Sequence, residues 1–412
     1  MPTRGHGISP APAISPPIFL EFLVIAVRMY RRVFFAVVLL IFLLAGVNLP
    51  VGTGWTAARW VVLSVGALAG LVIALKDRRL HFGFFHIVAF FSVLAALISA
   101  AVSRYPDVAS LKVLSILLLF VYAGTGARIA ANGREKRFFN GLLIGCEVFV
   151  GVNAVFYGIG IAVMGNPNSL GAVMGIIGAP ILLWGVLLGG EPSTQRCRLA
   201  WYAVCMYLVF MSHSRAGIAA ALLSSGLLCF ASRRYKLLAE GLIVFVILVA
   251  VVSLFRPEAF PSLASSVFYK EREEGIFTSR VSPWESAFHN IRDHPWFGMG
   301  LGTTAKGGDV REEHGKFASS ENVTTEIGSS YLALLAGVGV VGALRFTVLL
   351  LLLHGKILRT LIWMRNSRSA SHAAVPLAMV VVAGMLHAAF EDWMFAPGNY
   401  LCVFFWSLAF LL

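Results

Sequence analysis

The lengths of the apolar runs constrain this chain most. A helix needs roughly 17 to 25 apolar residues to cross the hydrocarbon core of a bilayer. The sequence predicts twelve such crossings, of which the seventh and the last are short. The predicted spans lie near residues 33–48, 56–75, 82–102, 109–129, 139–162, 169–189, 199–212, 216–231, 237–255, 329–353, 374–395 and 398–412.

The composition agrees with this prediction and excludes a soluble globular domain. Hydrophobic residues make up 58% of the 412 residues, charged residues make up 13%, and the mean hydropathy is +0.82. In soluble domains roughly a quarter of the residues are charged. The five cysteines lie in or beside apolar runs, so the sequence predicts neither a disulfide framework nor a zinc site. We therefore expect an all-α polytopic membrane protein with about twelve transmembrane helices.

The formal net charge of +13 follows the positive-inside rule rather than the pattern of a nucleic-acid-binding protein. Twenty of the 33 Lys and Arg residues fall in the N-terminal segment and in five short loops, all of which lie inside if the N-terminus is cytoplasmic. The first apolar run has no clear signal-peptide cleavage site, so we expect it to be retained. The predicted parts are a cytoplasmic tail (1–30), helices one to nine (31–255), a long outer loop (256–328) and helices ten to twelve (329–412).

The predicted outer loop contains the stretch Ser279–Gly302, which reads SRVSPWESAFHNIRDHPWFGMGLG. Its apolar residues follow the period of a short amphipathic helix, which Pro295 would end. A turn then follows on three glycines, Gly298, Gly300 and Gly302. Loops of this length between spans are usually functional or disordered, and the Trp, Phe, Pro and Gly content favours a folded, functional one.

Two motifs lie at predicted outer helix ends. Asn166–Gly171 reads NPNSLG, in which Asn168 is suited to cap the following helix. Ser212–Gly217 reads SHSRAG, and its Arg215 stands at a helix start, where the helix dipole favours anions. Arg215 therefore either extends its guanidinium group to the lipid headgroups or binds a phosphate together with the helix amides. His213 suits a hydrogen-bonding neighbour better than a base.

Two further motifs carry ionisable side chains. Glu321–Leu332 reads ENVTTEIGSSYL, and its Glu326 is either a helix cap or a general base. His387–Trp393 reads HAAFEDW at the outer end of the eleventh predicted span, where ionisable residues that face a bundle interior usually mark a site. We therefore expect His387 and Glu391 near a cleft at the outer face.

Together these motifs resemble the bacterial O-antigen ligase and O-antigen polymerase superfamily. The similar elements are NPNxLG, SRxG, an Arg followed by Trp and hPxxGxGxG, SYL before GxxG, and FExWxFxxGN. The resemblance implies a C-type glycosyltransferase-like architecture and a donor glycan linked to undecaprenyl pyrophosphate, whose pyrophosphate Arg215 and Arg280 bind. Ligases of the superfamily carry a His just before the Tyr-Leu pair. The equivalent position here is Gly328.

The resulting prediction is a membrane glycosyltransferase of the bacterial inner membrane with its site facing the periplasm. The two arginines would neutralise the leaving pyrophosphate while a base takes the proton of the acceptor hydroxyl. The candidate bases are Glu326, His314, His387 and Glu391. The sequence lacks the P-loop, the dinucleotide-binding fingerprint, HExxH and Asp-x-Asp, so we expect no cofactor and no metal.

The missing His favours a polymerase of surface polysaccharide or exopolysaccharide over a ligase. The expected partners are the lipid-linked glycan donor, a glycan or lipid A core acceptor and other polysaccharide assembly proteins, with no nucleic acid. The alternative function is a transporter or flippase of lipid-linked glycan. The sequence shows no internal repeat, and its polar residues gather at one face, which favours the enzyme.

Overall fold

The computed structural model describes residues 54–76, 82–103, 105–128, 135–161, 163–164, 167–255, 278–303 and 327–412. Within these ranges the chain forms helices joined by turns and contains no strand, which confirms the all-α prediction for them. The predicted tail at 1–30 and the first predicted span at 33–48 lie outside the described residues.

Helix is present at each of the eleven spans predicted from 56–75 onward. The helices are α2 (Gly54–Lys76), α3 (Phe84–Ala101), α4 (Pro106–Val121) continued by the π-helix η1 (Tyr122–Ala127), α6 (Glu135–Gly158), α7 (Pro167–Val173) continued by the π-helix η2 (Met174–Gly178) and α8 (Ala179–Leu187), α9 (Pro192–Met211), α10 (Arg215–Ala231), α11 (Tyr235–Phe255), α13 (Thr278–Asp293), α16 (Ser330–Ser367), α17 (Ala374–His387) and α18 (Tyr400–Leu411).

Length and composition divide the apolar helices of the described residues into two groups. Five segments are long and apolar enough to cross a membrane: Phe84–Ala101, Pro106–Ala127, Arg137–Gly158, Pro167–Leu187 and Ser330–Ser367. Four apolar helices are shorter: Arg59–Leu75, Arg215–Ala231, Ala374–His387 and Tyr400–Leu411. The count of twelve crossings and the side of the long loop stay predictions.

Two predicted boundaries differ from the structure. α16 continues to Ser367 through residues predicted as a basic loop, because no Pro interrupts it and Lys and Arg are good helix formers. The span predicted at 374–395 ends as a helix at His387, and turns occupy the chain up to Asn399. This turn segment, residues 388–399, forms part of the candidate site described below.

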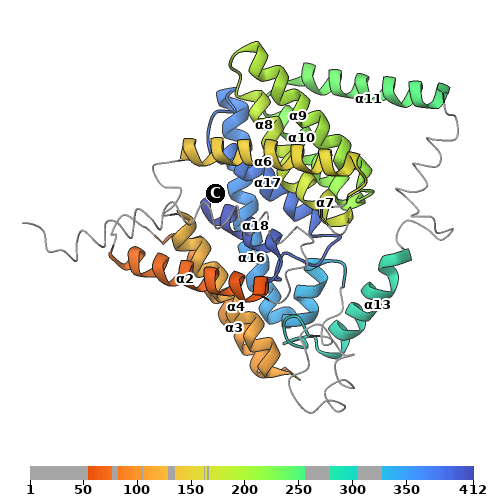
Figure 1. Ribbon diagram of the computed structural model, residues 1–412. Helices are drawn as coiled ribbons and strands as arrows, with labels where there is room; N and C mark the ends of the chain where they lie inside the picture. Colours follow the sequence, from red (N-terminus) through yellow and green to blue (C-terminus); the bar gives the residue numbers. More distant parts are fainter. Residues whose placement is uncertain are drawn as a thin grey trace, which may run out of the picture.

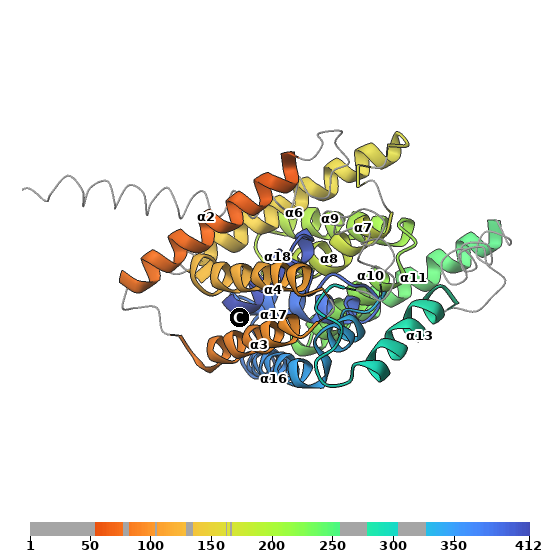
Figure 2. The same cartoon turned by 90° about the horizontal axis from the view of Figure 1, so that it is seen from below.

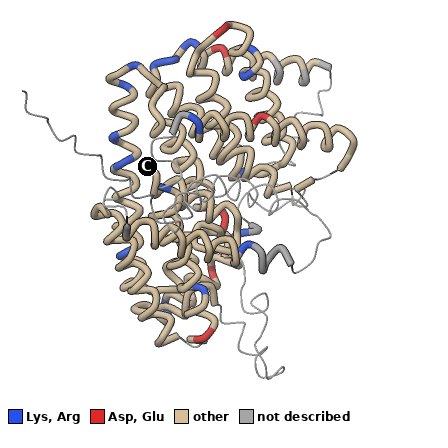
Figure 3. Tube along the Cα trace, turned by 60° about the vertical axis from the view of Figure 1, so that its left-hand side comes forward, with Lys and Arg blue, Asp and Glu red and all other residues tan. Residues whose placement is uncertain are grey.

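The helices that position the site pack around α3 and α10. α3 contacts both α4 and α16, while α10 contacts η2, α8 and α17 (Figure 1). α11 lies against α10 at the edge of the molecule, and α13 lies against α16 at another edge (Figures 1 and 2). Lys and Arg are spread widely along the described chain, whereas Asp and Glu occur at few places (Figure 3).

Candidate active site

The glycine loop, residues 294–303, follows α13 and docks on the first part of α16. α16 is broken at Gly339, whose backbone has φ 63° and ψ −174°. Backbone hydrogen bonds join the loop to both sides of this break: Met299 N to Ala336 O (3.0 Å), Gly300 N to Gly337 O (2.9 Å), Val340 N to Pro295 O (2.8 Å) and Val341 N to Trp296 O (3.1 Å). The loop therefore bonds to backbone groups that the interrupted helix leaves without helical partners.

The glycines of this loop are required by its conformation, as the sequence predicts. Gly298, Gly300 and Gly302 all have positive φ, a region that other residues rarely adopt. At Gly298 a Cβ atom would also lie 2.5 Å from the carbonyl carbon of Gly337. The glycine motif that resembles the superfamily signature thus lets the backbone of the loop contact the backbone of α16.

Two side chains from α3 and α4 hold the glycine loop from the other side. The Ser99 hydroxyl donates to the carbonyls of Phe297 and Gly337. The Lys112 ammonium donates to the carbonyl of Gly302. The sequence analysis missed both residues, because each lies inside an apolar run and gives no local signal of a partner about 190 residues away.

Arg280 on α13 forms an ion pair with Glu391 of the turn segment, with 2.6 Å between Nη2 and Oε1. The side chains are 23% and 26% exposed, respectively. Arg280 lies directly over Gly328, where φ is 69° and where an added Cβ would overlap the guanidinium group. Gly328, which the motif resemblance equates with the His of the ligases, therefore leaves the space that the Arg280 guanidinium group occupies.

Ser330, the first residue of α16, fixes the turn segment that carries Glu391. Its backbone N donates to Ala388 O at 2.9 Å, and its hydroxyl donates to Glu391 O at 2.7 Å. The same hydroxyl accepts from Trp393 N at 3.1 Å and from Met394 N at 3.0 Å. Ser330 is another functional residue that the sequence analysis missed, although it lies within the quoted SSYL motif.

His387 is buried at the end of α17. Its Nδ1 accepts a hydrogen bond from Trp393 Nε1 at 3.0 Å, and its Nε2 has no hydrogen-bond partner within the described part of the chain. Trp393 belongs to the turn segment that carries Glu391, so His387 packs against that segment; its place near a cleft stays a prediction. Its burial and its bond to Trp393 indicate that it positions the turn segment rather than meeting a substrate.

Arg215 is the first residue of α10 and lies within electrostatic reach of Arg280. Ser214 caps this helix through its Oγ, which accepts from Gly217 N at 3.2 Å. A Cβ on Gly217 would lie 2.5 Å from the carbonyl oxygen of Gly171, so the SHSRAG and NPNSLG motifs are in direct contact. Small residues allow this close approach of two helices.

The structure therefore brings Arg215, Arg280, Glu391 and His387 together from α10, α13, α17 and the turn that follows. Glu326 and His314 lie outside the described residues. Within the described ranges no three His, Cys, Asp or Glu side chains are grouped to hold a metal ion. Chemically, the site offers two guanidinium groups for an anion and one partly exposed carboxylate that can accept a proton.

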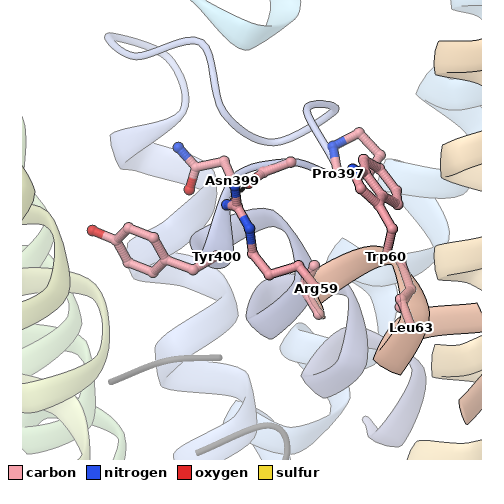
Figure 4. Close-up of a pocket in the computed structure, with 8 residues that line it drawn as sticks. Arg59, Trp60, Leu63, Pro397, Asn399 and Tyr400 are labelled. Atoms are coloured by element: carbon pink, nitrogen blue, oxygen red, sulfur yellow. Dashed lines mark hydrogen bonds between the residues drawn. The ribbon is translucent and has the colours of Figure 1, made fainter. Parts of the chain in front are cut away.

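A small pocket opens between α2 and the end of the turn segment (Figure 4). Arg59 and Trp60 line one side of it, and Asn399 and Tyr400 line the other. The Arg59 guanidinium donates to the carbonyl of Gly398 across this pocket. The Asn399 side chain is used locally, because its Oδ1 accepts from Leu401 N and caps α18.

Comparison with known proteins gives a family match, and it covers several of the motifs described above. A search of curated proteins found no match. Residues 199–347, a little over a third of the chain, match a family model described as O-Antigen ligase. The matched region contains the SHSRAG motif, α13, the glycine loop and the start of α16. Over residues 199–347 this chain is therefore similar to the O-antigen ligase family, which confirms the resemblance that its motifs predict.

Proposed function

We propose that this protein transfers or polymerises glycan from an undecaprenyl-pyrophosphate-linked donor at the periplasmic face of the bacterial inner membrane. The observation that carries the proposal is the placement of Arg215 and Arg280 within electrostatic reach of each other, beside the carboxylate of Glu391. A guanidinium group binds phosphate through two parallel hydrogen bonds and keeps its charge, so two of them suit a pyrophosphate. The O-antigen ligase match includes both arginines and supports the same activity.

In the proposed reaction the acceptor hydroxyl oxygen attacks the anomeric carbon of the donor while the bond from that carbon to the pyrophosphate oxygen breaks. Undecaprenyl pyrophosphate leaves, and Arg215 and Arg280 stabilise the negative charge that grows on it. A base takes the acceptor hydroxyl proton. The guanidinium groups supply the positive charge that this step needs, so we propose a metal-independent mechanism.

Among the four candidate bases, Glu326, His314, His387 and Glu391, we favour Glu391. His387 is buried and bonded to Trp393, whereas Glu391 is partly exposed and touches Arg280. A pyrophosphate that binds Arg280 competes with the Glu391 carboxylate for the same guanidinium group. A carboxylate that loses its cationic partner becomes a stronger base. Donor binding would therefore activate the base as it fills the site.

The acceptor distinguishes a polymerase from a ligase, and Gly328 favours the polymerase. The His that ligases carry here would have to share the space of the Arg280 guanidinium group. We therefore propose a second lipid-linked repeat, rather than the lipid A core, as the acceptor. The alternative function, transport of a lipid-linked glycan without chemistry, would use the same arginines to hold the pyrophosphate.

A transfer assay tests the proposal. Purified protein is incubated with synthetic undecaprenyl-pyrophosphate repeat unit, either alone or with lipid A core, and with EDTA throughout. A ladder of products from the repeat unit alone, strongly reduced in Arg280→Ala, is the expected result. A product only with lipid A core would identify a ligase instead, and donor binding without product in either tube would favour transport.

A further inference from the structure

A cluster of basic side chains lies far from the candidate active site along three of the same helices, near the start of α3, directly after η1 and in the second half of α16. This basic cluster consists of His86 on α3, Arg128 at the end of η1 and Lys356 on α16. His86 precedes Ser99, which contacts the glycine loop, by thirteen residues, so the two lie about 20 Å apart along α3 at 1.5 Å per residue. Lys356 lies about 24 Å along α16 from Val340 by the same measure.

The members of the basic cluster touch or act on one another. Arg128 Nη1 lies 3.2 Å from His86 Nε2, at hydrogen-bonding distance. Lys356 Nζ lies 4.5 Å from the centre of the Phe85 ring, a cation–π contact. The charges of Arg128 and Lys356 both act on His86, and that of Arg128 acts on Lys356. All three side chains are partly buried.

The fold fixes the position of the cluster. The π-helix η1 brings Gly124 against His86, where a Cβ would lie 3.3 Å from the imidazole Cδ2. Phe410 of α18 packs edge-on against His86, with 5.4 Å between the ring centres. Single turns of π-helix inside α-helices occur frequently at functional sites. The cluster is therefore built from four packed helical elements and does not depend on one flexible surface loop.

Two neighbouring cations in a partly buried place repel each other, and an anion between them would remove that repulsion. Among the described residues the contact of the Lys356 ammonium is the cation–π contact with Phe85, and an ammonium group carries three hydrogen-bond donors. α3 and the segment formed by α4 and η1 are each long and apolar enough to cross a membrane, which puts the ends that carry His86 and Arg128 at the level of the headgroups.

We infer that the basic cluster binds the phosphate of an anionic phospholipid headgroup. An Arg fork beside a Lys point charge suits a phosphate, and basic pockets between membrane helices are known to bind anionic headgroups. The shared chemistry is a phosphate group, which free inorganic phosphate also provides. The proposal commits to the lipid, because His86 lies in the first turn of α3 and Arg128 directly follows η1, at the ends of two segments that are long enough to cross a membrane. It goes beyond the proposed transfer reaction and does not depend on it.

The test uses the full chain reconstituted in nanodiscs of phosphatidylcholine with or without phosphatidylglycerol. Lipid binding is measured by native mass spectrometry and by the melting temperature. Lys356→Met keeps an unbranched side chain beside Phe85 and removes the charge together with its cation–π contact, and Arg128→Gln keeps a polar side chain. The matched control is Arg359→Ala, which removes an exposed charge from the same helix.

We expect the wild type and the Arg359→Ala protein to prefer phosphatidylglycerol and to melt higher with it. Each substitution in the cluster should weaken that preference about tenfold, the value of one charge-assisted hydrogen bond to the bound phosphate, which Arg359 does not make. Equal binding of both lipids by the wild type, or an unchanged preference in Lys356→Met, would overturn the proposal. An equal rise in melting temperature with inorganic phosphate in lipid-free detergent would identify a free-phosphate site and also overturn it.

Discussion

Arg280 Nη2 and Glu391 Oε1 lie 2.6 Å apart, although 111 residues separate them in the chain. The ion pair joins α13 to the turn segment that follows α17. Each side chain is about three-quarters buried, so the loss of either would leave the other as a poorly solvated charge. The ion pair therefore links α13 to the turn segment. In the proposed function it also couples donor binding to the basicity of Glu391, because the pyrophosphate competes with this carboxylate for Arg280.

Replacement of Arg280 by Ala should reduce glycan transfer about 10- to 100-fold, the value of a charged hydrogen bond to the leaving group. The transfer rate of Arg280→Lys should lie between those of the wild type and Arg280→Ala, because Lys keeps the charge but loses the bidentate fork. The rate of transfer is measured at fixed donor concentration, with the melting temperature recorded for each variant. Arg359→Ala serves as the control for loss of one positive charge. Full activity in Arg280→Ala would remove the arginine from the reaction.

Replacement of Glu391 by Gln separates donor binding from transfer. The amide keeps the size of the side chain but cannot take a proton, so kcat should fall. Donor binding should be retained or become tighter, because Arg280 no longer has a competing anion. Titration of donor into the purified variant measures the first quantity and the transfer assay measures the second. Weakened donor binding with unchanged kcat would mean that Glu391 only holds Arg280 in place.

Replacement of Gly328 by Ala should destabilise the protein by about 1 to 3 kcal/mol, because the position has φ of 69° and its Cβ would overlap Arg280. The loss of the Arg280 position should also lower transfer. Gly355→Ala is the matched control: it lies inside α16 with no atom near an added Cβ, so its stability should be unchanged or slightly higher. Equal melting temperatures of the two variants would contradict the steric argument.

Replacement of Ser330 by Ala removes a hydroxyl that bonds to three backbone groups of the turn segment. We expect a loss of about 1 to 3 kcal/mol in the free energy of unfolding, since two buried amides lose their acceptor. Transfer should fall more than stability, because Glu391 moves with this segment. Ser115→Ala is the control, since its hydroxyl bonds only locally, to Leu111 O. If both variants behave alike, Ser330 does not position the segment.

The apolar runs predicted the helices well, because the length of a run and the residues that end it are local properties of the sequence. The short helix of this stretch, which runs over Thr278–Asp293, its end before Pro295 and the glycine turn that follows are likewise local and are found as predicted. The predicted apolar face is only partly buried: Ala287 packs against Ile327, whereas Phe288 is exposed.

The remaining features depend on contacts between distant parts of the chain. The break of α16 at Gly339 exists because the glycine loop bonds to both sides of it, and the GxxG element that contains this glycine did not by itself predict a break. The end of α17 at His387 depends in the same way on Ser330, which bonds to the turn segment. The motif resemblance named Arg215 and Arg280, but neither motif could indicate that Arg280 pairs with a glutamate 111 residues later.

The contact between Gly328 and Arg280 also restricts how a chain of this kind can change over many generations. A histidine at residue 328 would clash with the Arg280 guanidinium group in its present position. A protein with that substitution alone would therefore have a disturbed site. Residues 328 and 280 are therefore expected to covary. Among relatives, those that carry a side chain at the first position should hold their arginine differently, and those that keep glycine should also keep a carboxylate at the position of Glu391.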